Sequence, residues 1–282
     1  MLVGVALLVI GLLSGLLLLK SKELADIKGG GGEDLKLGQE QEQEQEQEQE
    51  QEQEQEQEQE SNIVTDIDSN VYKTVKIGNQ VWMAENLRTT RYADGTTIPM
   101  GRSKSATTAY RYAPDNNSNN VSKYGYLYNW PAVMPGARSS ESNPSGVQGI
   151  CPDGWHVPSD AEWTELEYYV SGQSEYVCGN DKGKIAKALA SMDGWENSDK
   201  DYVVGNTPSS NNSTGFSALP AGNYYYHYNG YYLYFGYNAY FWSATESGGG
   251  DAFNRSLHSN NANVSRGYKD KGNGCSVRCV RD

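Results

Sequence analysis

The feature that most constrains this chain is an uninterrupted Gln-Glu repeat over residues 39–60, which offers no apolar side chain for a core. A Gly run at residues 29–32 precedes the repeat. We therefore expect residues 29–60 to form a low-complexity stalk and residues 61–282 to form the one folded domain. Removing the 11 Glu of the repeat from the formal net charge of -13 leaves only -2. Because so neutral a remainder has no basic surface for phosphates, we expect no nucleic-acid partner.

An apolar run between Leu2 and Leu19 is long enough to cross a bilayer, since a helix of that length spans about 27 Å. The run lacks the basic n-region and the small-residue cleavage site of a secretory signal. We expect residues 1–28 to be a retained anchor helix, which would place the domain outside the cytoplasm at the cell surface. Lys20 and Lys22 follow the run and oppose this orientation under the positive-inside rule. A leader removed before Met1, as in pilin-like precursors, would resolve the conflict.

The folded domain has short strand-like segments between turn residues and few helical patterns. Val71–Ile77 alternates, residues 78–79 are Gly-Asn, and Gln80–Met83 continues, which predicts a β-hairpin. Ser159 with Glu162 forms a capping-box pattern, and the helix that it starts ends at Gly172. A second helix is predicted over residues 182–192. The predicted class is α+β, with two helices and twisted antiparallel sheets.

Four Cys occur in this domain, at Cys151, Cys178, Cys275 and Cys279. An even number of Cys behind a membrane segment favours two disulfides and an oxidising compartment. Four Cys allow three pairings, and the residues alone do not choose among them. The spacing of Cys275 and Cys279 is poor for zinc, because no matching short pair is present upstream.

Six motifs strongly resemble the Fibrobacter succinogenes major paralogous domain, in the order found in that family. They are WMAENL (82–87), YGYLY (124–128), CPDGWHVPSDAEW (151–163), GFSALP (215–220), FWSATE (241–246) and SVRCVRD (276–282). The family is similar to the C-type-lectin-like and sulfatase-modifying-factor folds. The resemblance implies a lectin-like domain over about residues 71–282, which would lie behind the N-terminal hydrophobic helix and the stalk.

The resemblance also implies a disulfide between Cys151 and Cys279, which leaves Cys178 and Cys275 to pair with each other. Members of the family look like surface or secreted proteins, and related lectin-like domains serve as diversified binding proteins. The resemblance supplies no catalytic residue and no cofactor. It does not account for the anchor and the stalk.

Residues 223–240 have the most distinctive composition, because 9 of these 18 residues are Tyr. The Asn229-Gly230 step predicts a two-residue hairpin turn, in which opposite residues have numbers that sum to 459. Leu233 and Phe235 would then mark the inward face. Four residues would face outward: Tyr225, His227, Tyr232 and Tyr234. Tyr with Asn and Ser is the composition of antibody binding surfaces, although an aromatic strand pair that only shields the core has the same composition.

A second strand-like segment, residues 251–259, alternates so that three polar side chains share one side: Asn254, Ser256 and His258. These residues would extend the outward face of the hairpin. The seven outward residues form the predicted site for a protein or glycan ligand. We therefore interpret the chain as a membrane-tethered, surface-displayed binding module.

An enzyme is not expected, because none of the three His has a companion nucleophile motif. No metal site is expected either. The lectin-type calcium motifs are absent, and Asp66, Asp68 and Asn70 form only half of a calcium loop.

Two other hypotheses remain open. In a pilin-like filament, the N-terminal helix would pack with copies of itself and the domain would lie outside, although Val5 stands where such subunits usually carry an acidic residue. In a sulfatase-modifying type of oxidase, Cys275 or Cys279 would have to be a free thiol.

Overall fold

The computed structural model describes residues 62–101, 105–225 and 230–282. These residues form mostly antiparallel sheet with four α-helices, which confirms the sheet-rich class with few helices. The predicted anchor helix and stalk lie outside the described residues. Within the described residues, no helix is both long and apolar enough to span a membrane.

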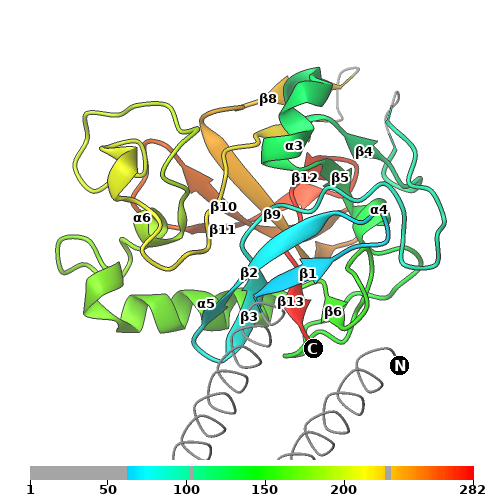
Figure 1. Ribbon diagram of the computed structural model, residues 1–282, viewed down its shortest axis with the longest axis horizontal. Helices are drawn as coiled ribbons and strands as arrows, with labels where there is room; N and C mark the ends of the chain where they lie inside the picture. Colours follow the sequence, from blue (N-terminus) through cyan, green and yellow to red (C-terminus); the bar gives the residue numbers. More distant parts are fainter. Residues whose placement is uncertain (1–61, 102–104, 226–229) are drawn as a thin grey trace, which may run out of the picture. The chain divides into compact units, whose positions relative to one another are not determined.

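The first sheet contains five strands and holds both ends of the described domain (Figure 1). Its order is β1 (Ile63–Thr65), β2 (Val71–Ile77), β3 (Gln80–Met83), β13 (Val280–Arg281) and β6 (Trp155–His156). The last strand along the chain, β13, therefore lies between β3 and β6, and the chain ends beside the strands with which the domain begins.

The other two sheets position the Tyr-rich region. One has the order β11 (Ser265–Asp270), β10 (Asp251–His258) and β9 (Asn238–Gly248). The other has the order β4 (Arg111–Tyr112), β5 (Leu127–Asn129), β12 (Gly274–Cys275), β7 (Asn223–Tyr225) and β8 (Tyr231–Leu233). β10 is a central strand, so its two neighbours satisfy both of its backbone edges.

One α-helix is long, α5 (Asp160–Gly172), and the others are single turns. The short ones are α3 (Val121–Tyr124), α4 (Trp130–Val133) and α6 (Ala186–Leu189). Four 3₁₀ turns complete the helical elements: η1 (Pro114–Asn116), η2 (Ser118–Asn120), η3 (Ser174–Tyr176) and η4 (Pro208–Ser210). The second predicted helix, over residues 182–192, is thus only the one turn of α6.

Local signals fix α5 and the β2–β3 hairpin. Ser159 accepts a hydrogen bond from the Glu162 backbone N–H, and the Glu162 carboxylate accepts one from the Ser159 N–H, which completes the predicted capping box. Gly78 has a φ of 63° at the turn between β2 and β3, where a side chain would be strained. Both predicted elements are confirmed.

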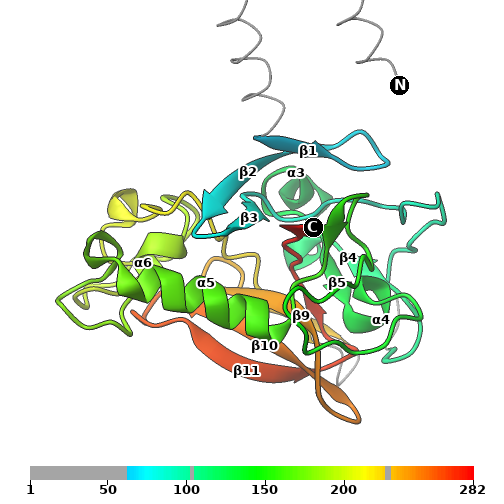
Figure 2. The ribbon, with the colours of Figure 1, turned by 90° about the horizontal axis from the view of Figure 1, so that it is seen from below.

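Helix α5 packs on the β9–β10–β11 sheet (Figure 2). Arg255 of β10 is fully buried and reaches the helix, where it donates to the Asp160 carboxylate at 2.5 Å, to the Thr164 hydroxyl at 3.0 Å and to the Glu167 carboxylate. Arg266 of β11 adds a more exposed ion pair to Asp160 at 3.0 Å. These charges hold one face of the sheet against the helix.

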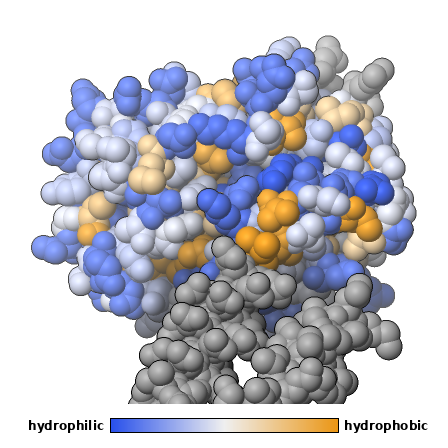
Figure 3. Space-filling view, viewed as in Figure 1, coloured by the Kyte–Doolittle hydropathy of each residue, from blue (hydrophilic) through white to orange (hydrophobic). Residues whose placement is uncertain are grey.

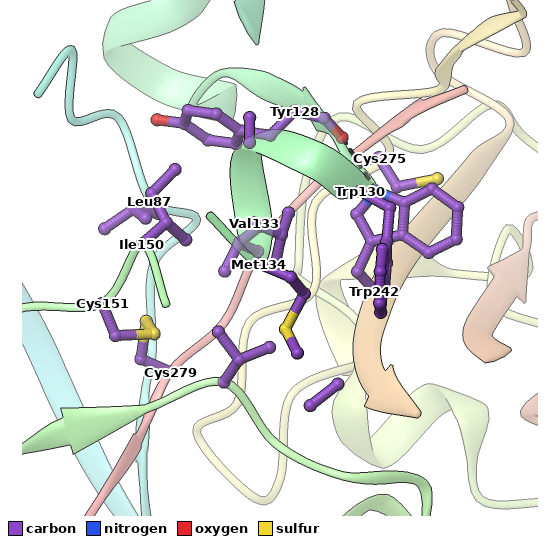
Figure 4. Packing of buried hydrophobic residues seen from close by; sticks show 14 of the residues in the cluster. Leu87, Tyr128, Trp130, Val133, Met134, Ile150, Cys151, Trp242, Cys275 and Cys279 are labelled. Carbon is purple, nitrogen blue, oxygen red and sulfur yellow. Dashed lines mark hydrogen bonds between the residues drawn. A yellow bond between two sulfur atoms is a disulfide. The ribbon is translucent and has the colours of Figure 1, made fainter. Parts of the chain in front are cut away.

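The core beneath the opposite face contains Trp130 and Trp242 and the Cys151–Cys279 disulfide (Figure 4). The Trp242 indole N–H donates to the Tyr128 carbonyl at 2.8 Å. The disulfide that the family resemblance implied is therefore present. It closes a sequence separation of 128 residues and ties the loop before β6 to the chain just before β13.

A fully buried guanidinium, that of Arg278, joins the chain just before β13 to two other segments. It donates to the carbonyl oxygens of Met83, Phe216 and Ser217 at 2.6–2.8 Å. It also donates to the Asn86 side-chain oxygen at 2.8 Å. Burial lowers the pKa of Arg278 to about 9. The four oxygen acceptors take the place of a carboxylate partner for this charge.

The chain end is held by His156 on β6. Its Nε2 lies 2.6 Å from the Glu162 carboxylate and its Nδ1 lies 2.7 Å from the Asp282 carboxylate. Burial opposes protonation of the imidazole, but the two carboxylates outweigh it and raise the pKa of His156 above its ordinary value. The start of α5 and the last residue of the sequence are thus linked through one imidazole.

Candidate functional site: the Tyr240 cluster and the tyrosine surface

Polar side chains gather on the face of the β9–β10–β11 sheet that points away from α5. Strand register places Tyr240 opposite Ser256, and Asn238 opposite His258. The Asn238 amide donates to the Tyr240 hydroxyl at 2.8 Å, and Ser256 Oγ lies 3.0 Å from His258 Nε2. The His258 ring meets Tyr240 edge-on, with ring centroids 5.9 Å apart. Two strands therefore present a set of hydroxyl, amide and imidazole groups side by side.

Lys269 of β11 reaches across this face, and its ammonium lies 3.9 Å from the centroid of the Tyr240 ring. Burial lowers the pKa of Lys269. Burial, with a smaller contribution from the Lys269 charge, also lowers the pKa of His258. Among the described residues the Lys269 ammonium has no hydrogen bond and no ion pair. In the described part of the chain, this half-buried charge is stabilised only by the cation–π interaction with Tyr240.

β12 and its neighbour β7 bring two further polar side chains, those of Cys275 and Asn223, to the same region. The Ser276 N–H donates to the Tyr240 carbonyl at 2.9 Å, which places the end of β12 next to β9. Gly274 pairs with Tyr224 in an antiparallel register, so Cys275 lies opposite Asn223. Asn223 is 2% exposed, and neither its side-chain oxygen nor its side-chain nitrogen has a partner in the described part of the chain. A buried amide without partners is rare in folded proteins.

The Cys275 thiol is free and fully buried, and its side chain lies beside Trp130 and Trp242 (Figure 4). Burial raises the pKa of Cys275 to about 12, so the thiol is protonated at neutral pH. The predicted disulfide between Cys178 and Cys275 is wrong. β12 directs Cys275 into the core beside these indoles, whereas Cys178 lies in a partly exposed turn, where its N–H bonds to the Lys184 carbonyl.

We call this set the Tyr240 cluster. Its members are Tyr240, Ser256, His258, Lys269, Asn223 and Cys275. Burial raises the pKa of Tyr240 to about 12 against the opposing hydrogen bond from Asn238, with smaller contributions from Cys275 and Tyr234, so Tyr234 is a neighbour of the cluster.

Three exposed rings lie on the chain between β7 and β9. Tyr231, Tyr234 and Tyr237 are 55%, 53% and 50% exposed, and we call them the tyrosine surface. In the same segment, Tyr224 stacks on Tyr112 with centroids 3.8 Å apart, and Tyr232 meets Tyr224 edge-on at 5.3 Å. The Tyr-rich segment therefore both shields a core and displays rings to solvent.

The register of the Tyr-rich hairpin differs from the predicted one. Tyr224 pairs with Tyr232 and Tyr225 with Tyr231, so five residues connect the two strands instead of two. Gly230 lies against the Tyr224 phenol, where an added Cβ would be only 2.1 Å from the hydroxyl.

The seven predicted site residues have different positions. Tyr234 is exposed, while Tyr225, Tyr232 and His258 are partly buried. His227 lies outside the described residues. Asn254 and Ser256 are only 2% and 5% exposed, so the prediction that they face solvent is wrong. The core around Trp242 covers the face that the alternation assigned to solvent, and α5 covers the other face.

Sequence reasoning missed Lys269, Tyr240, Tyr231 and Tyr237. Lys269 had a usable signal, because it alternates with Ser265 and Gly267 in a strand-like segment. Tyr240 had no local signal, because the segment beside it, which includes Cys275 and Ser276, is 35 or more residues away in the chain.

Within the described residues, no group of three or more His, Cys, Asp and Glu side chains could hold a metal ion. The side chains of the half calcium loop, Asp66, Asp68 and Asn70, make hydrogen bonds and ion pairs within the domain. The Asp66 carboxylate accepts hydrogen bonds from the backbone N–H groups of Asp68 and Asn70 at 2.9 Å, and the Asp68 carboxylate pairs with Arg91 at 2.6 Å. These contacts make a turn.

Two other surface features are present in the described domain. Apolar side chains of Ile63, Ile67 and Val71 are exposed over the β1–β2 hairpin (Figure 3). A groove of about 960 Å³ runs past Val75, Met192 and Leu219. Lys123 and Asp193 on its wall pair with each other at 2.6 Å, so their charges are already compensated.

A model of the Fibrobacter succinogenes major domain matches residues 75–281 of this chain. The match covers more than half of the chain and agrees with the family resemblance of the six motifs. No curated protein matches the chain. No solved structure matches it either, so the likeness to C-type lectins stays a prediction.

Proposed function

The chain belongs to the Fibrobacter succinogenes major domain family, and from that premise we propose that it is a membrane-tethered, surface-displayed domain that binds a protein or glycan ligand. The tyrosine surface supports this function. Tyr gives a large amphipathic contact area, and ordering its side chain costs little entropy because only two torsion angles are fixed. Three such rings are exposed within seven residues, and one of them, Tyr234, lies close enough to Tyr240 of the Tyr240 cluster to affect its pKa.

The position of the tyrosine surface also supports display. β8 lies at one end of the described domain, while the start of β1 and the end of β13 lie toward the other (Figure 1). A domain tethered through residues preceding β1 would present β8 away from its attachment point. In this proposal the apolar run between Leu2 and Leu19 is the anchor and the Gln-Glu repeat is the spacer.

A binding function accounts for the chemistry of the site better than an oxidase does. Cys279 is bonded to Cys151, and the free Cys275 thiol is buried and protonated. A reactive thiol is instead partly exposed and has a lowered pKa. Cys275 meets the requirement for a free thiol but lacks this environment.

The test is a screen of the full-length chain, held in lipid nanodiscs, against arrays of glycans and of surface proteins. A variant with Tyr231→Ala, Tyr234→Ala and Tyr237→Ala should lose binding by at least about 30-fold, since a single hot-spot residue contributes about 2 kcal/mol or more. The matched control is Tyr168→Ala on α5, which removes an 81% exposed ring from a different element. Equal losses in the control and the triple variant would rule out the tyrosine surface as the site.

A further inference from the structure

We propose that the Tyr240 cluster is a carboxylate subsite, and that the ligand is an acidic oligosaccharide whose uronate group pairs with Lys269. The proposal rests on the binding function proposed above and names the chemical class of the ligand. The observation behind it is a half-buried ammonium without an anionic partner, surrounded by hydrogen-bonding groups.

The Lys269 ammonium is costly in its present position. Most of its solvation is lost, and within the described residues only the Tyr240 ring compensates the charge. The other cations on this sheet are paired, Arg255 with Asp160 and Glu167 and Arg266 with Asp160, and Lys271 just after β11 pairs with Glu246. An incoming carboxylate would give Lys269 the partner that its neighbours already have.

The groups around Lys269 suit an oxygen-rich ligand. Tyr240 keeps its phenolic proton at neutral pH, and Ser256 and His258 lie one strand away on the same face. Asn223, across from Cys275, has a buried amide whose two polar atoms lack partners in the described part of the chain. The cluster therefore contains more hydrogen-bonding groups than its internal contacts use. This indicates that a ligand or bound water completes it.

A saccharide fits the surroundings better than an acidic peptide. The large exposed side chains of residues 231–237 are all Tyr, and exposed aliphatic side chains, which anchor many protein partners, are instead found on the β1–β2 hairpin. Flat rings cover the apolar face of a sugar ring, and phenol, hydroxyl and amide groups bond to its hydroxyls. A uronate carries its carboxylate directly on such a ring, so one ligand could use the rings and Lys269 together.

The test measures binding of the full-length chain in nanodiscs to oligogalacturonate and to its methyl ester by calorimetry. The two probes share the sugar and differ in the charge of the carboxyl group. Oligogalacturonate should bind at least about tenfold more tightly, and Lys269→Met should remove that difference while Lys269→Arg keeps most of it. The control is Lys76→Met on β2, which removes an exposed lysine away from the cluster and should change nothing.

Folding of the variant is checked separately. Lys269→Met keeps the aliphatic stem and removes an unpaired half-buried charge, so its unfolding midpoint should equal or exceed that of the parent chain. A marked loss of stability would show that Lys269 is structural and would overturn the subsite.

Three results of the binding experiment would overturn the proposal: no binding of either probe, equal affinity for the acid and the ester, and tighter binding of a poly-glutamate peptide than of oligogalacturonate. The binding experiments also distinguish failure of the subsite from failure of the proposed binding function. Loss of a neutral ligand in the tyrosine-surface variant, with no effect of Lys269→Met, would leave a binding domain without a carboxylate subsite.

Discussion

At the residue scale, His156 links the stability of the domain to pH. Because its pKa is raised in the folded chain, its contribution is complete below about pH 6.5, the ordinary pKa, and is lost as the pH rises through the folded pKa. Urea unfolding midpoints of the full chain should therefore fall as the pH rises above about 6.5. His156→Gln should flatten this fall and cost about 3–5 kcal/mol at pH 6, because it leaves the buried Glu162 carboxylate without its charged partner. Parallel pH profiles for the two chains would contradict the assignment.

The two free thiols should differ in reactivity at the same scale. Cys178 is partly exposed, whereas Cys275 is buried among aromatic side chains and has a raised pKa. A thiol reagent should label one Cys in the native chain and a second only in denaturant without reductant. Cys178→Ser should abolish the native reaction, and Cys275→Ser should abolish only the second. Absence of any thiol in denaturant would mean that these two Cys form a bond.

At the element scale, the attachment of α5 to the β9–β10–β11 sheet depends on Arg255. Arg255→Met should destabilise the domain by about 3–5 kcal/mol, because Asp160 and Glu167 are left without the buried cation. Arg266→Met removes a half-exposed partner of the same Asp160 and should cost under about 1 kcal/mol. Unfolding midpoints of the two variants measure the contrast, and similar values would show that burial does not set the strength of these pairs.

Sequence patterns were sufficient for elements with local signals. Ser159, Glu162 and Gly172 determine α5 from within its own segment, and Gly78 determines the β2–β3 turn. The Asn229-Gly230 step is equally local, yet it gave the wrong register. In the structure Tyr224 stacks on Tyr112, more than a hundred residues away in the chain, and pairs with Tyr232 instead of with Phe235. Tertiary contacts override turn propensity in that hairpin.

At the scale of the whole molecule, the Cys151–Cys279 bridge should contribute much of the stability. For a closed loop on the order of a hundred residues, the chain-entropy model gives about 4–5 kcal/mol. Reductant should therefore lower the urea midpoint of the full chain strongly, and a variant with Cys151→Ala and Cys279→Ala should start low and be insensitive to reductant. An equal response of both chains would contradict the pairing.

The candidate site could be predicted only in part, because which face of a strand is buried depends on the packing of the whole domain. Alternation in β10 correctly separates Asn254, Ser256 and His258 from Phe253, Arg255 and Leu257. It cannot tell which face is covered. Here α5 covers one face and the core around Trp242 covers the other at Asn254 and Ser256, while His258 at the end of β10 stays partly exposed. The charge of Arg255 suggests an exposed position, but Arg255 is buried. Asp160 and Glu167 of α5, about ninety residues earlier in the chain, neutralise it.

The sharing of one sheet by β1 and β13 has a mechanical consequence. If the domain is tethered through the residues before β1 and binds a ligand near β8, as proposed, tension would enter it at β1, an edge strand of three residues, and cross the domain before reaching the ligand. The hydrogen bonds of β1 would experience that load first. The Cys151–Cys279 disulfide would hold the segments next to β6 and β13 together, so under such tension the domain would lengthen at β1 while the proposed site stayed folded.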